Sequence, residues 1–66
     1  MLETELEIEN VGVTGDGDIT YYRRGEMDVS GITLIRRKNE TYTVEIHFYD
    51  GRCKTYCQPY IVCYET

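Results

Sequence analysis

The first ten residues carry the most regular arrangement of charged side chains in the sequence. Four carboxylates occupy every second position, at Glu3, Glu5, Glu7 and Glu9. On an extended strand these side chains share one face and lie about 6.7 Å apart, twice the rise per residue. Evenly spaced carboxylates on a rigid sheet can imitate a phosphate backbone, whose charges follow one another roughly every 3.4 Å along each DNA strand. Such a face suits an arginine-lined protein surface.

Two structural explanations compete with this functional one. Natural proteins often charge the solvent side of an edge strand, which prevents aggregation. Alternatively, the glutamates form cross-strand ion pairs with basic residues of the same chain. The candidates for that pairing are Arg23, Arg24, Arg36 and Arg37.

Two further acids, Asp16 and Asp18, lie within the segment Gly15-Asp16-Gly17-Asp18. A calcium loop beginning at Asp16 needs glycine at its sixth position, where this chain has Tyr21. The two glycines instead predict a turn.

One histidine and three cysteines form the set that most resembles a metal site: His47, Cys53, Cys57 and Cys63. Zinc sites use thiolate and imidazole ligands in closely spaced pairs. Cys53 and Cys57 are separated by three residues, and His47 faces them across the Asp50-Gly51 turn, but this spacing matches no common zinc pattern. We predict no metal and no cofactor, and keep a metal-stabilised module as an alternative.

The chain has one histidine and one serine, and the catalytic arrangement that we consider is a nucleophilic cysteine paired with the histidine. No recognisable orienting third group, strand-to-helix elbow or glycine-rich oxyanion loop accompanies it. A chain of 66 residues also has little room for the pocket of roughly 300 Å³ or more that ligand sites use. We predict that the protein is not an enzyme.

Aromatic and basic side chains adjoin at Tyr21-Tyr22-Arg23-Arg24 and at Ile35-Arg36-Arg37-Lys38. Strands that mix such residues bind single-stranded nucleic acids by stacking and phosphate contacts. Adjacent strand residues face opposite sides, however, so only half of each group serves one surface. A small nucleic-acid binder remains an alternative, with the residues Tyr21, Tyr22, Arg23, Arg36 and Arg37.

The charge is unevenly distributed along the chain. The net charge is −5, and residues 1–18 hold six acids and no lysine or arginine, whereas residues 19–66 hold six acids and seven basic side chains. An acidic segment repels nucleic acid and anionic lipid and favours basic protein surfaces. We therefore expect a basic protein partner, no membrane and no direct binding of nucleic acid. The absence of a leader and three clustered cysteines, an odd number, favour the cytoplasm.

Alternation and turn signals place these residues on strands. The absence of alanine and the many threonine, tyrosine, isoleucine and valine residues favour sheet over helix. Val11-Gly12-Val13 interrupts the first strand as a bulge or bend. Asp50-Gly51 predicts a hairpin with a type I′ turn. The predicted strands are Leu2–Asn10, Ile19–Arg24, Gly31–Lys38, Thr41–Tyr49, Arg52–Cys57 and Tyr60–Glu65, with room for one short helix in residues 24–30.

These elements predict one domain over residues 1–66 that is mainly β. We expect an antiparallel meander of five or six strands, forming a twisted sheet or a small barrel. A sheet this small leaves edges uncovered, so a homodimer is a further alternative.

The small size, acidity and sheet content resemble those of phage-encoded inhibitors of host defence, including anti-CRISPR proteins that mimic DNA. That resemblance implies a non-enzymatic protein that acts in the host cytoplasm. Its partner would be a basic, nucleic-acid-binding protein or complex. The contact residues would be Glu3, Glu5, Glu7, Glu9, Asp16 and Asp18.

Overall fold

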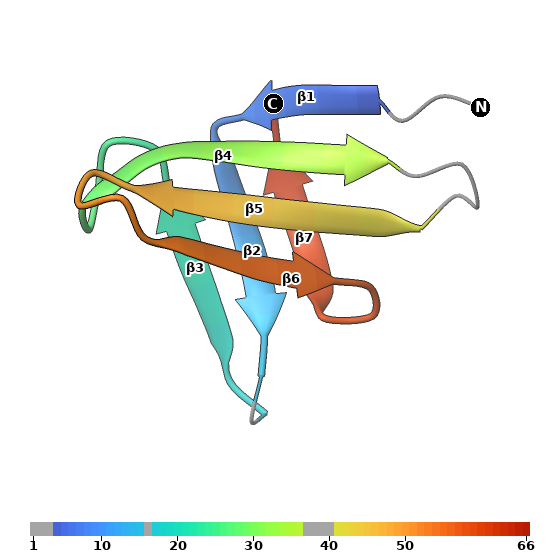
Figure 1. The fold of residues 1–66 in the computed structure, drawn as a ribbon. Helices are drawn as coiled ribbons and strands as arrows, with labels where there is room; N and C mark the ends of the chain where they lie inside the picture. Colours follow the sequence, from blue (N-terminus) through green and yellow to red (C-terminus); the bar gives the residue numbers. More distant parts are fainter. Residues whose placement is uncertain (1–3, 16, 37–40) are drawn as a thin grey trace.

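The computed structural model describes residues 4–15, 17–36 and 41–66, and within them the chain forms seven antiparallel strands (Figure 1). The described part contains no helix, and so none that could cross a membrane. The predicted all-β class is confirmed. The strands are β1 (Thr4–Ile8), β2 (Asn10–Thr14), β3 (Ile19–Arg23), β4 (Val29–Arg36), β5 (Tyr42–Phe48), β6 (Cys53–Cys57) and β7 (Ile61–Glu65).

The strands form two sheets that lie face to face. Sheet A has the order β1-β4-β5-β6 and sheet B the order β3-β2-β7. Figure 1 shows the strands of sheet B crossing behind those of sheet A at a steep angle. In such orthogonal packing, the corners are made by strands that switch sheets through a bend. Here the chain bends at Glu9, between β1 and β2.

The chain forms seven strands rather than the predicted five or six, because the bend separates β1 from the additional strand β2. Only β4, β5 and β6 follow one another as a meander, because β1 pairs with β4, and β7 pairs with β2. The segment expected as a bulge, Val11-Gly12-Val13, lies inside the additional strand β2. The irregularity is real but smaller, since the β2–β7 register shifts between Gly12 and Val13.

The core lies between the inner faces of the two sheets. Sheet A contributes alternate residues of β4 and β5, and sheet B contributes Val11, Val13 and Tyr22. The Tyr22 ring packs edge-on against Phe48, with 6.3 Å between the centroids. The buried cluster comprises Ile8, Val11, Val13, Tyr22, Val29, Ile32, Leu34, Val44 and Ile46.

The short helix allowed in residues 24–30 does not form, because the backbone there has the wrong hand. Gly25, Met27 and Asp28 have φ angles of +88°, +55° and +64°. Consecutive residues in the left-handed region cannot belong to a right-handed helix. The amide of Val29 instead donates to the carbonyl of Glu26 at 2.9 Å, which closes a tight turn before β4.

The hairpin predicted at Asp50-Gly51 joins β5 and β6, but its turn differs from the expected type. Gly51 alone of the three loop residues has a positive φ, +93°. The Gly51 amide donates to the Phe48 carbonyl, and the Phe48 amide donates to the Arg52 carbonyl. This is a three-residue loop with a glycine bulge rather than a type I′ turn. The backbone amide of Arg52 donates to the Asp50 carboxylate and is the main cause of a lowered Asp50 pKa.

The last strand follows a cis peptide bond between Gln58 and Pro59. The segment is held against the start of β5: the Gln58 amide donates to the Tyr42 carbonyl, and the Tyr42 amide donates to Gln58 Oε1 at 2.9 Å. β7 then lies at an edge of sheet B, as the proline predicts.

Candidate protein-binding surface

The strand predicted to carry the acidic row is extended and lies at the edge of sheet A. β1 pairs with β4 through five consecutive residues, with Glu5 opposite Ile35 and Glu7 opposite Thr33. Side chains paired across strands share a face. The pair of Ile8 and Ile32 lies in the core cluster, so Glu5 and Glu7, which point to the opposite face from Ile8, project from the outer face of sheet A, and both are exposed.

The opposite side of β1 is less buried than its alternation predicts. Ile8 is 1% exposed and lies next to the bend, whereas Leu6 is 47% exposed. Sheet B covers β1 only near this bend, so the more distant Leu6 remains partly in solvent. The strand thus offers acidic side chains on one face and an accessible leucine on the other.

Arg24 neutralises part of the acidic row. Its guanidinium lies 2.9 Å from the Glu9 carboxylate and 4.0 Å from that of Glu7. The Arg24 amide also donates to the Glu9 carbonyl at 2.9 Å, which fixes the arginine beside the bend. The ion pairs with basic residues of the same chain, which the sequence offered as an alternative to a functional face, are thus present for Glu9 and, at a longer distance, for Glu7. Glu5 has no ion pair with any residue that the structure describes.

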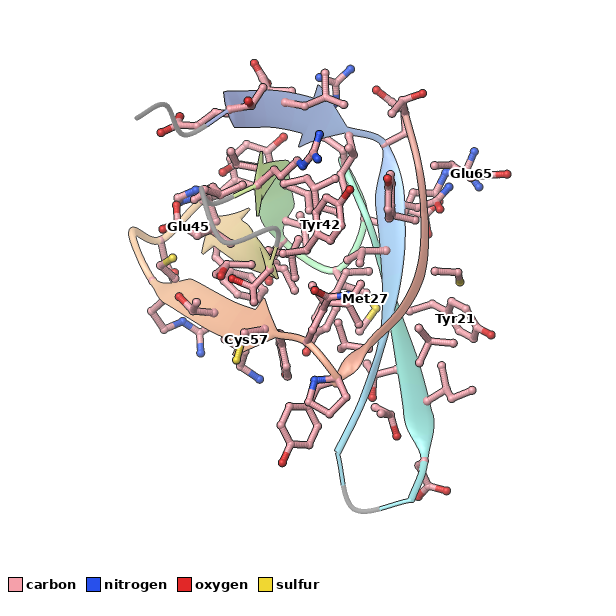
Figure 2. All side chains as sticks on the ribbon, turned by 90° about the vertical axis from the view of Figure 1, so that its right-hand side faces the viewer. Tyr21, Met27, Tyr42, Glu45, Cys57 and Glu65 are labelled. Atoms are coloured by element: carbon pink, nitrogen blue, oxygen red, sulfur yellow. The ribbon has the colours of Figure 1, made fainter. Side chains whose placement is uncertain are left out.

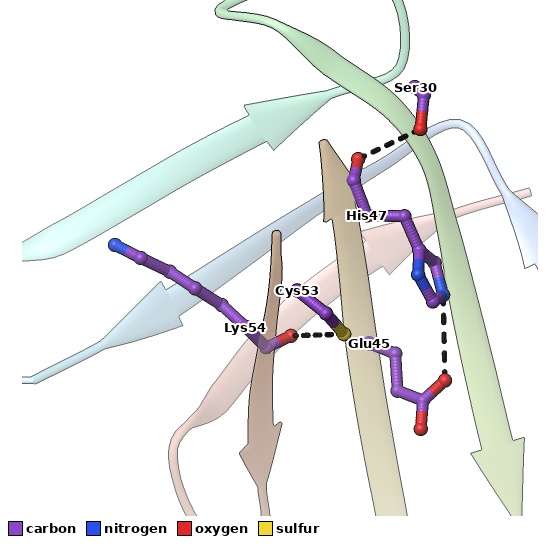
Figure 3. Close-up of polar contacts among 5 residues, drawn as sticks. All are labelled: Ser30, Glu45, His47, Cys53 and Lys54. Atoms are coloured by element: carbon purple, nitrogen blue, oxygen red, sulfur yellow. Dashed lines mark hydrogen bonds and ion pairs between the residues drawn. The ribbon is translucent and has the colours of Figure 1, made fainter. Parts of the chain in front are cut away.

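Glu45 adds a carboxylate to the same face. The register aligns Glu7, Thr33 and Glu45 across β1, β4 and β5, which places the two glutamates about 9.6 Å apart, two strand spacings. His47 Nε2 lies 3.5 Å from Glu45 Oε1 (Figure 3). The alternation of β5 predicts that Glu45 faces outward, but its alignment with Glu7 requires the pairing of β1 with β4.

Not all predicted contact residues lie together. Asp18 precedes β3 at the tip of the β2–β3 hairpin, at the opposite end of the molecule from β1 (Figure 1). Glu3 and Asp16 lie outside the described residues. The acidic face of sheet A (Glu5, Glu7 and Glu45) is therefore the part of the prediction that one surface can present.

The set that resembles a metal site is divided between two sheets. His47 and Cys53 are direct neighbours across β5 and β6, whereas Cys57 lies four residues along β6, about 13 Å away. Figure 3 shows the His47 ring turned toward Glu45, and the Cys53 thiol next to the Lys54 carbonyl. Cys63 belongs to β7 of sheet B. Among the described residues, no three potential ligands lie close enough to hold a metal ion.

The residues of the nucleic-acid alternative also separate. Tyr22 is buried in the core, whereas Tyr21 projects from the outer face of sheet B (Figure 2). Arg23 lies 3.9 Å from Glu26, and Arg36 belongs to sheet A. Arg37 falls outside the described ranges. Those of the five residues that the structure describes therefore do not share one face.

The sequence gives no direct signal for an open pocket between the start of β5 and β7. Its volume is about 390 Å³, and the Tyr42 side chain lies between the two sheets (Figure 2). The cluster of tyrosines after Pro59 is the one local hint of an aromatic lining. The pocket is lined by Tyr42, Gln58, Ile61, Val62, Cys63 and Tyr64.

Comparison of the chain with protein-family models, with curated proteins and with solved structures finds no match to any of them.

Proposed function

We propose that this protein is a non-enzymatic binding module whose acidic face of sheet A engages a basic surface of another protein. The observation that supports it most is the position of Glu5 and Glu7 on the outer face of an edge strand. Among the described residues, Glu5 forms no ion pair, and Glu7 forms one, with Arg24 at 4.0 Å. Exposed carboxylates of this kind attract a positively charged partner over roughly 8–10 Å at physiological salt.

The narrower form of the proposal is an inhibitor that occupies the nucleic-acid channel of its partner. The spacing of Glu5 and Glu7, about 6.7 Å along the strand, and the third carboxylate at Glu45 support this form. A channel lined with arginine would then bind either this protein or nucleic acid, but not both. Competition by duplex DNA for the bound partner is expected if this form is correct.

The proposal is tested with a defined basic probe, a nine-residue peptide in which arginine and valine alternate. Its affinity is measured by fluorescence anisotropy for the wild-type protein and for Glu5→Gln/Glu7→Gln. We expect binding to weaken about tenfold, since each exposed ion pair contributes up to about 1 kcal/mol. Added salt should weaken wild-type binding by screening the carboxylates.

The matched control is Asp18→Asn/Asp28→Asn, which removes the same number of charges outside β1 and the acidic face of sheet A. Both aspartates are exposed and form no ion pair with a described residue. This double variant should bind the peptide within about twofold of wild type. Equal weakening in both variants would mean that the peptide senses only net charge, and the acidic face would be excluded as a specific site.

A further inference from the structure

The free edge of β1 is the most regular open sheet edge that carries acidic side chains. β1 lies at the end of sheet A, and Figure 1 shows no ribbon beyond it. Its ladder with β4 runs through all five residues without a shift of register. Every second residue of such a strand directs its N–H and C=O groups away from the sheet, where they can pair with an added strand.

The other sheet edges are less open to a basic strand. β3 carries Arg23 and β6 carries Lys54, and each would repel a positively charged neighbour. β7 pairs with β2 through a shifted register, and such irregularities disturb regular strand addition. Charge and regularity together single out β1.

The charge of β1 also decides which of two kinds of strand can pair with its free edge, a second copy of β1 or a basic strand. A second copy of the same strand would bring Glu5 and Glu7 close to identical carboxylates, which destabilises the pairing. A strand with lysine or arginine at alternate positions gains from the same carboxylates. Its remaining side chains would lie on the other face of sheet A, beside the half-exposed Leu6.

We propose that the partner adds an extended segment to sheet A along β1, and that basic and apolar residues alternate in this segment. The segment is the complement of β1: its basic side chains lie beside Glu5 and Glu7, and its apolar side chains contact Leu6. This inference rests on the proposed acidic binding face and adds that backbone hydrogen bonds, as well as charge, hold the partner. Main-chain pairing provides affinity in strand addition, and alternate side chains provide specificity.

Backbone methylation of the arginine–valine peptide tests the inference. One derivative is N-methylated at the arginines and the other at the valines, so that each loses the N–H donors of one edge. Because only one edge of the peptide can face β1, one derivative should lose at least tenfold in affinity, and the other should remain within about threefold. Amide exchange should slow in β1 and stay unchanged in β6, the opposite edge of sheet A.

Each outcome is decisive. If both derivatives bind like the parent peptide, strand addition is wrong while the acidic face stands. An equal loss in both derivatives also excludes strand addition, since pairing uses one edge. If the parent peptide fails to bind, or binds Glu5→Gln/Glu7→Gln as tightly as wild type, the acidic face itself is wrong.

Discussion

At the scale of single residues, the most informative contrast lies on one face of β1, where Ile8 and Leu6 share a direction but not an environment. Ile8 is 1% exposed and belongs to the core cluster, whereas Leu6 is 47% exposed. Truncation of a fully buried isoleucine removes contacts and leaves a cavity. We expect Ile8→Ala to lower the free energy of unfolding by about 2–5 kcal/mol, and Leu6→Ala by less than about 1 kcal/mol. Urea denaturation measures both, and similar losses would contradict the structure near the bend.

Backbone conformation makes Gly51, in the β5–β6 hairpin, sensitive to substitution. Its φ is +93°, and an added Cβ would meet no atom within 4 Å. The cost of Gly51→Ala is therefore conformational, about 1–2 kcal/mol for an L-residue in the left-handed region. Gly31→Ala is the matched control, because that site is equally open and its φ is not in the left-handed region. Thermal unfolding should show a loss for the Gly51 variant only.

The phenol of Tyr56 links stability to alkaline pH. Its hydrogen bond with Tyr22 and its partial burial raise the pKa of Tyr56 above the ordinary value of 10.0. Because the folded state favours the neutral phenol, this interaction stabilises the fold fully below pH 10.0. The stabilisation is lost as the pH rises through the folded-state pKa. Tyr56→Phe should cost about 1 kcal/mol at neutral pH, the value of one hydrogen bond. Its stability should also fall less steeply above pH 10.0 in denaturation series, and parallel curves would contradict this assignment.

At the scale of elements, the bend between β1 and β2 is held by Arg24, whose guanidinium neutralises acidic charge. The side chains of Arg24 and Glu9 are each about half exposed, so their ion pair contributes at most about 1 kcal/mol to folding. We expect Arg24→Gln to bind the arginine–valine peptide more tightly, by about threefold, because Glu7 and Glu9 become available. Arg23→Gln is the control for charge, since Arg23 pairs with Glu26 instead. Fluorescence anisotropy measures the affinity of both variants for the peptide. An equal increase in affinity for the two variants would mean that only the net charge of the protein matters.

The strands could be predicted from the sequence because alternation and turn residues are local signals. Tyr42, Val44, Ile46 and Phe48 occupy every second position of the predicted strand Thr41–Tyr49, and they pack in or against the core. β2 could not be recognised, because Val11-Gly12-Val13 is short and a glycine occupies its centre. Packing favours that glycine, because a Cβ at Gly12 would lie 2.8 Å from the Tyr21 ring and the ring would have to move. This contact depends on the pairing of β2 with β3, which no local pattern encodes.

The candidate surface could be predicted only in part for the same reason. The outward direction of Glu5 and Glu7 follows from alternation within one strand. The separation of Asp18 from them, the ion pairs of Arg24 and the alignment of Glu45 with Glu7 depend on sheet order. Contacts between residues distant in sequence decide which charges share a surface and which are neutralised.

At the scale of the whole molecule, the three thiols are divided between two sheets, and none is bonded to another. Cys53 and Cys57 are about 13 Å apart along β6, given the strand rise, whereas a disulfide needs Cα atoms within about 7 Å. Cys63 lies on sheet B, and all three are exposed and free. Mild oxidation should therefore yield intermolecular dimers and larger species, seen by non-reducing electrophoresis. Replacement of all three by serine should preserve the fold and abolish these species, and an oxidised monomer with an internal disulfide would contradict the arrangement.

Through its backbone, Glu9 at the bend is hydrogen-bonded to two parts of the chain that are distant in sequence. The amide of Glu9 donates to the carbonyl of Glu65 in β7, and the carbonyl of Glu9 accepts from the amide of Arg24 after β3. A ligand that binds along β1 would therefore lie beside a residue that is hydrogen-bonded to the ends of both outer strands of sheet B. Hydrogen exchange at the Glu9 and Arg24 amides, whose bonds join the end of β1 to sheet B, is the measurement that would show whether occupancy of β1 reaches the second sheet.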